Sequence, residues 1–276
     1  RSVMILAVVL HMVRTYFWGA YKKPRELTWV TGVFIFIVVI TFGITGYLVP
    51  WNQIAFWATT VGTESANKVP IIGEWLRYFI RGGDVVTGET LSRFFVVHVI
   101  ILPWVLTGLI AVHLFLMRAT NLSTLERVGE EKTLDPKYGI PFFPVHVCKE
   151  SIVAVLLFAV LITLSVLSPW EIGEPANPLA TPEHIKPEWY FLPSYQLLKY
   201  FEGPYGAFFG IMACSLPFLL LVLWPFLDRG KQRHPRRRPL AVGFGLIGLV
   251  GALVLGVLGH FSETEQNFFG RRYHID

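Results

Sequence analysis

The chain alternates between long apolar runs and polar stretches, and five of the runs are long enough to predict membrane-spanning helices. A spanning helix needs roughly 20 apolar residues, because each residue rises about 1.5 Å and the hydrocarbon core is about 30 Å thick. A shorter run, Met4–Trp18, starts almost at residue 1 and predicts a truncated first span. We therefore expect an all-α fold, a polytopic transmembrane bundle of about six helices. The full spans are predicted at Trp29–Val49, Phe94–Met117, Ser151–Leu167, Ala207–Leu227 and Leu240–Leu258.

The composition supports a membrane protein and excludes several other classes. Hydrophobic residues make up 53% of the 276 positions and charged residues 16%, with a mean hydropathy of +0.52, which excludes a disordered chain. The two cysteines, Cys148 and Cys214, form no CxxC motif, so we expect neither a disulfide scaffold nor a thiolate metal site. The net charge is +5, and the Lys and Arg residues lie between the apolar runs. We therefore expect a lipid membrane around the chain and no nucleic-acid partner.

The basic residues are distributed unevenly over the predicted loops. The loops at 21–27, 118–149 and 228–238 carry 14 Lys and Arg residues, whereas the two long loops at 51–93 and 168–203 carry six. Because basic loops remain on the cytoplasmic side, the first three are predicted on that (n) side. The two long loops are predicted on the opposite (p) side, and loops of such length are usually functional.

Three histidines, His11, His98 and His113, lie inside predicted spans, where an ionisable group needs a partner. His98 and His113 are 15 residues apart, which is four turns plus about 60° in an ideal helix, so both project toward a similar side. His11 and His113 each lie close to a basic n-side loop and can face each other at the same depth. Imidazole is a common axial ligand of haem iron, so this pattern favours two stacked haem sites. For each histidine alone, the proton relay of a transporter is the alternative.

Two glycines of the second predicted span support a flat cofactor. Gly32 and Gly46 are 14 residues apart, about 40° short of the same helix face. A glycine lets a macrocycle approach the backbone, although simple helix packing explains such glycines equally well. The partner of His98 would lie upstream of His11, before residue 1, so we interpret the chain as incomplete.

Five short motifs follow one another in a fixed order. They read KPRELTWVTGV at 23–33, GYLVPWNQ at 46–53, SRFFVVH at 92–98, GEPANP at 173–178 and PEWY at 187–190. The ordered set resembles cytochrome b of the quinol-oxidising cytochrome bc complexes, over nearly the whole chain. In that family PEWY marks the p-side quinol site, and GYxLPWxQ ends the third helix.

Two details resemble the plastid type of this family: the 15-residue histidine spacing and the three helices after the haem-binding half. Plastid proteins have two separate polypeptides, so this chain resembles a fused form, as in some bacteria. The resemblance implies a haem-binding half at 1–120, an n-side connector at 121–149 and a C-terminal half at 150–276. Residues 1–3 resemble the start of the motif RSVH, yet Met4 replaces its histidine, so the first helix and first p-side haem ligand are expected to be missing.

The resemblance implies a membrane subunit of a quinol:cytochrome c (or plastocyanin-like acceptor) reductase with two b-type haems. Quinol would be oxidised on the p-side of a bacterial inner membrane, and electrons would pass through both haems to an n-side quinone, coupled to proton translocation. The implied partners are a Rieske iron–sulfur protein, a c-type cytochrome subunit and a second copy of the complex. A di-haem b anchor of a dehydrogenase or hydrogenase leaves the PEWY loop unexplained, and a secondary transporter predicts inverted repeats, which the sequence does not show.

Glu188 is the candidate proton acceptor of the p-side site. Burial raises the pKa of a carboxyl group in an apolar pocket, which suits proton transfer near neutral pH. We expect Glu188 to open a short helix after Pro187, and a purely structural helix cap is the alternative. Tyr190 is expected to act with it by holding the loop through a hydrogen bond. The other residues expected around the p-side quinol are Tyr47, Pro50, Trp51, Pro187 and Trp189.

Four charged residues are candidates on the n-side. Arg118 lies where the plastid type carries an arginine at its n-side quinone site, and Lys149 with Glu150 resembles the family's Lys-Asp pair there. Arg14, one turn after His11, is a candidate partner of a haem propionate. All four could instead be interfacial charges. Pro103 and Pro217 are predicted to distort their helices. We assign no metal to His146, His184, His234, His260 or His274.

Overall fold

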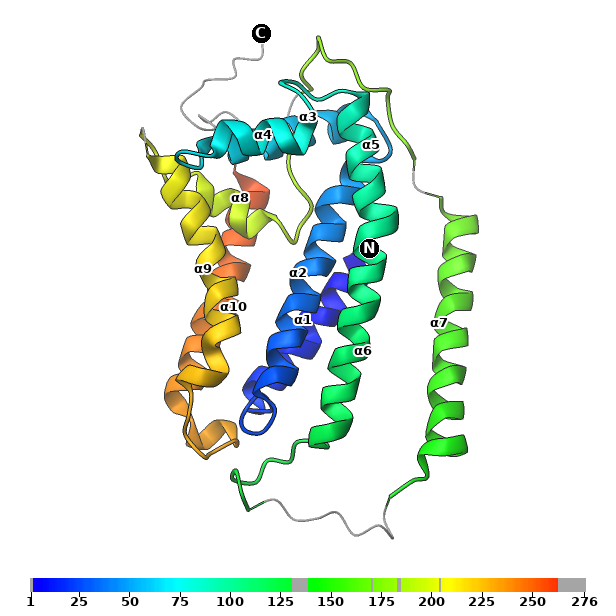
Figure 1. Cartoon of the computed structure of the whole chain (residues 1–276), viewed down its shortest axis with the longest axis vertical. Helices are drawn as coiled ribbons and strands as arrows, with labels where there is room; N and C mark the ends of the chain where they lie inside the picture. The colour runs from blue at the N-terminus through cyan, green and yellow to red at the C-terminus, as the bar shows by residue number, and fades with distance from the viewer. Residues whose placement is uncertain (1, 131–138, 170, 183–184, 204, 263–276) are drawn as a thin grey trace. The chain divides into compact units, whose positions relative to one another are not determined.

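The computed structural model describes residues 2–130, 139–169, 171–182, 185–203 and 205–262. Its regular structure is helical, as predicted, and Figure 1 shows the helices in chain order. Their bounds are α1 Ser2–Phe17, α2 Glu26–Leu48, α3 Gln53–Glu64, η1 Ser65–Lys68, α4 Gly73–Arg81, α5 Gly88–Val96, η2 Val97–Ile101, α6 Leu102–Thr120, η4 Phe142–His146, α7 Val147–Leu167, α8 Leu192–Leu198, α9 Gly206–Leu227, η5 Pro235–Arg237 and α10 Pro239–Phe261.

The chain divides into two compact units, each described by itself. Unit 1 contains Arg1–Gly129 and Glu174–Asp276, and unit 2 contains Glu130–Gly173 with α7. Unit 2 is essentially one long apolar helix, whose aliphatic side chains are exposed within the unit. The candidate site is therefore built from unit 1, and the predicted division of the chain near residues 120 and 150 stays a prediction.

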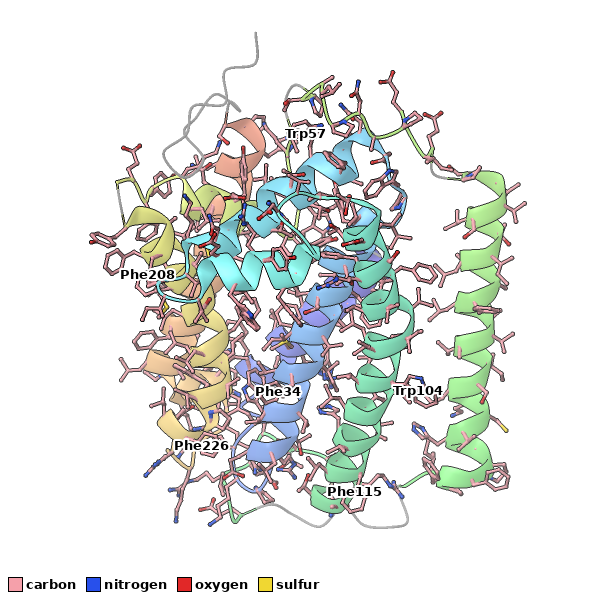
Figure 2. All side chains as sticks on the ribbon, turned by 45° about the horizontal axis from the view of Figure 1, so that its top comes forward. Phe34, Trp57, Trp104, Phe115, Phe208 and Phe226 are labelled. Carbon is pink, nitrogen blue, oxygen red and sulfur yellow. The ribbon has the colours of Figure 1, made fainter. Side chains whose placement is uncertain are left out.

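Five helices in the described part of the chain are long and apolar enough to cross a membrane, which confirms the five predicted spans. Helix α1 is also apolar but shorter, with 16 residues. Large side chains such as Trp104 and Phe115 project from α6 and are 76% and 69% exposed (Figure 2). Apolar side chains on the outside of helices suit a lipid environment, and the chain is a multi-pass membrane protein.

Helix α2 is the central element of unit 1 and packs against α1, α6 and α9. One end of it, here called the His113 end, is anchored by the indole of Trp29, which donates to the Leu221 carbonyl at 2.6 Å. The opposite end, the His98 end, is anchored by the fully buried Leu48. Each end has its own apolar cluster: Tyr16, Tyr21, Trp29 and Val33 at the first, and Leu48, Phe56, Val86 and Phe94 at the second.

Helices α3 and α4 lie across the His98 end of the spans (Figure 1). The buried guanidinium of Arg81, at the end of α4, holds them together. It donates to the hydroxyl of Thr63 at 2.8 Å and to the backbone carbonyls of Thr60 and Asp84. The Arg81 carbonyl accepts a hydrogen bond from Thr90 in α5. These short helices therefore form a fixed cover that joins the ends of α2 and α5.

The span that carries His98 and His113 is not a regular α-helix. Between α5 and α6 lies a π turn, Val97–Ile101, in which the Leu102 N–H donates to the Val97 carbonyl five residues before it. Pro103 follows in the first turn of α6. Proline has no N–H to donate and crowds the carbonyl four residues earlier, so a distortion at this point was expected. Helix α9, by contrast, continues as one helix through Pro217.

Candidate functional site

His113 is held by two neighbouring residues of α2. Its Nδ1 atom lies 3.1 Å from the hydroxyl oxygen of Thr31. Its ring also lies directly against Gly32, where an added Cβ would stand 3.2 Å from the His113 Cε1 atom. Gly32 therefore leaves the space that the imidazole occupies.

His98 repeats this arrangement at the other end of α2. Its Nδ1 atom lies 3.0 Å from the hydroxyl oxygen of Thr45. An added Cβ at Gly46 would stand only 2.5 Å from the His98 Cε1 atom, closer than real Cβ atoms approach their neighbours. The edge of the ring also meets Phe42, with ring centroids 5.2 Å apart. A consecutive Thr-Gly pair therefore faces each of His98 and His113.

The hydrogen bonds of the two threonines decide which imidazole nitrogen carries the proton. The Thr31 hydroxyl donates to the Thr28 carbonyl at 2.9 Å, and the Thr45 hydroxyl donates to the Thr41 carbonyl at 2.8 Å. Since a hydroxyl has one proton, each threonine can only accept from the histidine, so Nδ1 carries the hydrogen. The Nε2 lone pair is then available to a metal, as in metal-ligating histidines whose other nitrogen is hydrogen-bonded. The residues present therefore fit a haem iron.

His11 lies on α1, and Arg14 lies one turn later on the same helix. The side chains of His11 and Arg14 are exposed within the unit, so each can reach a group placed between α1 and α6. The predicted pairing of His11 with His113 at one depth stays a prediction.

A large cavity opens at the His98 end. Its volume is about 1300 Å³, and its wall is predominantly apolar. Of the residues predicted around a quinol, Tyr47, Pro187 and Glu188 line it, and Thr45, the partner of His98, does so as well. Its other lining residues come from α2, α3, η1, α4, α5, η2, α8 and the loop before α8. The cavity is large enough for a drug-sized molecule, and it contacts the threonine that holds a histidine.

The remaining predicted quinol residues lie beside this cavity. Trp51 packs edge-on against Phe56, and Trp189 is 43% exposed. Tyr190 lies against α2, where an added Cβ at Gly43 would stand 3.0 Å from its hydroxyl oxygen. Among the described residues, the lining set does not include Pro50, Trp51, Trp189 or Tyr190.

The expectation that Glu188 opens a short helix is wrong, and so is the alternative that it caps one. Helix α8 begins at Leu192, and its cap position is occupied by Phe191. Glu188 instead starts a turn in which its carbonyl accepts from the Phe191 N–H at 2.8 Å. A helix that began at Glu188 would place Pro193 in its interior, where proline disrupts the helix. Pro193 fits only the first turn, so the helix begins at Leu192 and a turn precedes it. The carboxylate therefore owes its position to the turn and the cavity wall.

Gln53 joins the PWNQ motif to the loop that leads to Glu188. Its side-chain oxygen accepts from the Asn177 N–H at 2.5 Å, and its side-chain nitrogen donates to the Ala180 carbonyl. Its own N–H donates to the Glu174 carbonyl. Two motifs more than 120 positions apart are thus bound side by side, which fixes the loop over the cavity.

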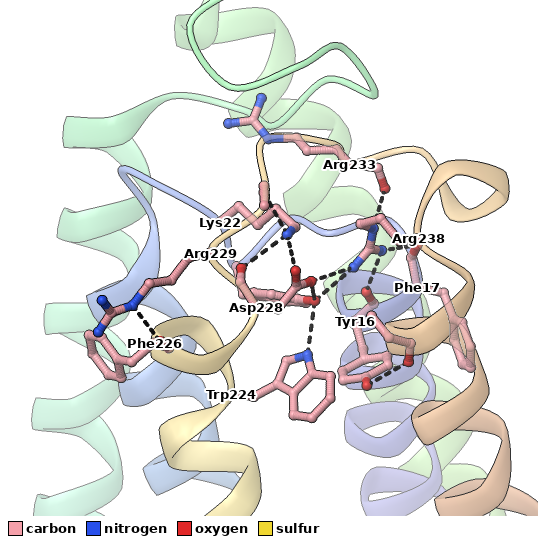
Figure 3. A network of polar contacts seen from close by, with 12 residues as sticks. Tyr16, Phe17, Lys22, Trp224, Phe226, Asp228, Arg229, Arg233 and Arg238 are labelled. Carbon is pink, nitrogen blue, oxygen red and sulfur yellow. Dashed lines mark hydrogen bonds and ion pairs between the residues drawn. The ribbon is translucent and has the colours of Figure 1, made fainter.

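The His113 end is closed by charged groups (Figure 3). Asp228, just after α9, accepts from the buried side chains of Lys22 at 2.5 Å and Arg238 at 3.1 Å, and from the Tyr21 hydroxyl at 2.6 Å. Burial would raise the pKa of Asp228, but its hydrogen bonds with Lys22 and Tyr21 outweigh burial and hold the pKa below its usual value. Arg238 also donates to the Tyr16 and Phe17 carbonyls, so the network ties α1 to α9 and α10.

The predicted n-side residues are not brought together within one unit. Arg118 lies exposed in the last turn of α6 in unit 1. Lys149 and Glu150 lie in the first turn of α7 in unit 2. Their grouping therefore stays a prediction.

Several residues of the site were missed by sequence reasoning. Thr31 and Thr45 each precede a glycine that was identified, so the 14-residue repeat of the Thr-Gly pair was the available signal. Arg93 lines the cavity five residues before His98 and offers a cation to an anionic group. Of the other histidines, His146 ends a π turn, His234 precedes η5 and His260 lies in α10. His184 and His274 lie outside the described residues.

Two family models match consecutive parts of the chain. The model described as Cytochrome b(N-terminal)/b6/petB matches residues 2–175, and the model described as Cytochrome b(C-terminal)/b6/petD matches residues 175–274. Together they cover both halves of the chain, in the order that the motifs predicted.

Individual relatives agree with these models. The chain is 41% identical over 254 residues to the cytochrome bc complex cytochrome b subunit of Chlorobaculum thiosulfatiphilum, covering 92% of this chain and 58% of that protein. It is 33% identical over 282 residues to cytochrome b of Cereibacter sphaeroides, covering 91% and 63%. A chain of a solved hyperthermophilic respiratory Complex III is similar in structure, with a TM-score of 0.80, 36% identity and coverage of 97% and 71%. The chain thus spans less than two thirds of these two curated relatives.

Proposed function

We propose, on the premise that this chain belongs to the cytochrome b family, that it is the electron-transfer core of a quinol-oxidising bc-type complex in a bacterial membrane. The observation that carries the proposal is the Thr-Gly-His arrangement, which occurs twice on the same pair of helices, once at each end. Two such arrangements provide two sites stacked across the bundle, as electron transfer across a membrane requires.

Each site would hold a b-type haem, which supplies reversible one-electron chemistry when bound. At the His113 end, His113 of α6 and His11 of α1 would hold the haem, and Gly32 leaves the space that the His113 ring occupies. At the His98 end, His98 would hold the haem, and Gly46 leaves the space for the His98 ring. Arg14 and Arg93 would pair with propionates at the two ends.

The cavity at the His98 end is the proposed quinol site on the p-side. An apolar wall accepts the quinone ring and tail, and the Glu188 carboxylate accepts a proton from the quinol hydroxyl. Tyr47 and Pro187 complete the wall, while Tyr190 positions the loop by packing on Gly43 of α2. Of the two electrons that the quinol releases, one would pass to a Rieske iron–sulfur protein and a c-type cytochrome subunit. The complex would be a homodimer.

At the His113 end, on the n-side, Arg118 would stabilise the negative charge of a quinone under reduction. Lys149 and Glu150 of α7 would take part in proton delivery on the n-side, as the family resemblance implies. Together the two quinone sites translocate protons, because quinol releases them on one side and quinone takes them up on the other.

Optical spectroscopy of the full-length protein in its purified complex tests the proposal. The reduced-minus-oxidised difference spectrum should show b-type bands, and the haem-to-protein ratio should be two per chain. Adding quinol should reduce these haems. A preparation of correctly folded protein without b-type bands would contradict the proposal and favour a transporter.

A further inference from the structure

The two helices that build the haem sites have different repeats along the chain. On α2 the two Thr-Gly pairs are 14 residues apart, whereas on the partner span the two histidines are 15 residues apart. In regular α-helices, 14 residues end about 40° short of four turns and 15 residues end about 60° past them. The two sets would thus be out of register by about 100°.

The structure shows no such mismatch. The Nδ1-to-hydroxyl distances are 3.1 Å at one end and 3.0 Å at the other, and each imidazole lies on the glycine that follows the threonine. Helix α2 is a regular α-helix from Glu26 to Leu48, so the adjustment lies in the other span. There it coincides with the π turn Val97–Ile101, which contains His98 itself.

We propose that this π turn is a register device that absorbs the one extra residue, so that His98 meets Thr45 and Gly46 as His113 meets Thr31 and Gly32. A single π turn inside an α-helix holds one residue more than an α turn, and the helix on either side continues in phase. The two histidines, 15 residues apart, then have the register of residues 14 apart in a regular α-helix. The inference rests on the proposed haem sites. It adds that the π turn of the backbone aligns His98, the proposed p-side ligand.

Removal of the extra residue gives a direct test. Without Val99, Leu102 follows Val97 by four residues, so their hydrogen bond becomes an α-helical one and the spacing of the histidines becomes 14. Pro103 would then crowd the His98 carbonyl, so the deletion is combined with Pro103→Ala, and Pro103→Ala alone is the control. Both variants should retain both haems in the full-length protein, with the low-spin electron paramagnetic resonance signal of the p-side haem unchanged.

The opposite change should disrupt only one site. An alanine inserted between Ile100 and Ile101 lengthens the spacing to 16 and turns His98 away by about 100°. The p-side haem content should fall at least about ten-fold, as when a metal ligand loses its supporting contacts, while the n-side haem remains. The n-side haem reports that the protein has folded, because its ligands lie on the far side of the changed turn.

The outcomes separate the inference from the proposed function. Absence of b-type haem from the unaltered protein contradicts the proposed function itself. Loss of only the p-side haem on deletion of Val99 overturns the register inference. If the deletion prevents folding, Thr45→Val decides: it should raise the reduction potential of the p-side haem alone, as Thr31→Val should raise that of the n-side haem. An unchanged p-side potential in folded Thr45→Val protein would overturn the inference.

Discussion

The two ends of unit 1 present the same histidine arrangement in opposite surroundings. At the His98 end, Thr45 holds the imidazole and also lines a cavity of about 1300 Å³. At the His113 end, aromatic rings pack around Trp29, and Asp228 binds two buried cations behind them. The ligand arrangement is thus set by α2, while the loops decide whether a small molecule can reach it. Under the proposed function, the cavity at the His98 end takes the quinol, while the Asp228 network stabilises the His113 end.

The first prediction distinguishes the two glycines, because it concerns loss of the cofactor itself. Gly46→Ala places a Cβ atom 2.5 Å from His98, whereas Gly32→Ala places one 3.2 Å from His113. Gly46→Ala should therefore remove most of the p-side haem, by about ten-fold or more, and Gly32→Ala should only shift the n-side spectrum. Haem analysis of the purified protein measures both, with Gly108→Ala as the control, because nothing lies within 4 Å of a Cβ there. Equal loss in both variants would contradict the difference between the ends.

Glu188→Gln tests whether the open end performs proton transfer. The amide keeps the size of the carboxylate but cannot accept a proton at neutral pH, so quinol oxidation should slow by about 10²-fold. Steady-state quinol oxidation against pH, with haem content verified, measures it, and the acid limb of the profile should flatten. Glu174→Gln, in the same loop, is the control. A wild-type rate and pH profile would show that Glu188 is structural.

Asp228→Asn tests the closed end. The amide leaves the charges of Lys22 and Arg238 without their carboxylate, which should cost about 2–3 kcal/mol, below the value for fully buried pairs because Asp228 is 18% exposed. Thermal unfolding measures the loss, with Asp84→Asn, whose carboxylate is 79% exposed, as the control.

Asp228→Asn should also change how the stability of the protein depends on pH. The pKa of Asp228 is held below its usual 3.8, so its contribution to stability is complete above that pH and is lost as the pH falls through the lower pKa of the folded state. Asp228→Asn should lack this acid-dependent loss. Equal acid sensitivity in both proteins would show that the network does not stabilise the His113 end.

The smallest effect is expected at Gly43. An added Cβ would stand 3.0 Å from the Tyr190 hydroxyl oxygen, so the ring must shift by a few tenths of an ångström. Gly43→Ala should raise the KM for quinol by about two- to five-fold and leave both haem spectra unchanged. Gly108→Ala is the control, because nothing lies within 4 Å of a Cβ there and Gly108 is not among the described residues that line the cavity. An unaltered KM would show that Tyr190 does not set the shape of the cavity.

The sequence predicted the five spans because they depend on the pattern along single helices, and the haem-binding role of the histidines stays a prediction. The π turn could not be predicted, since it reflects the match between two helices and not the pattern of either one. The Glu188 expectation failed because Phe191 occupies the cap position of α8, so the helix starts four residues later. The Asp228 network joins residues about 200 positions apart, and no local pattern indicates such contacts.

The central claim is that the two histidine arrangements hold separate haems at opposite ends of one helix pair. Redox titration of His113→Leu and His98→Leu, each in the full-length complex, tests it most directly. His113→Leu should lose the n-side haem and keep p-side haem, and His98→Leu should do the reverse. Retention of two full b-type haems in His113→Leu would contradict the account.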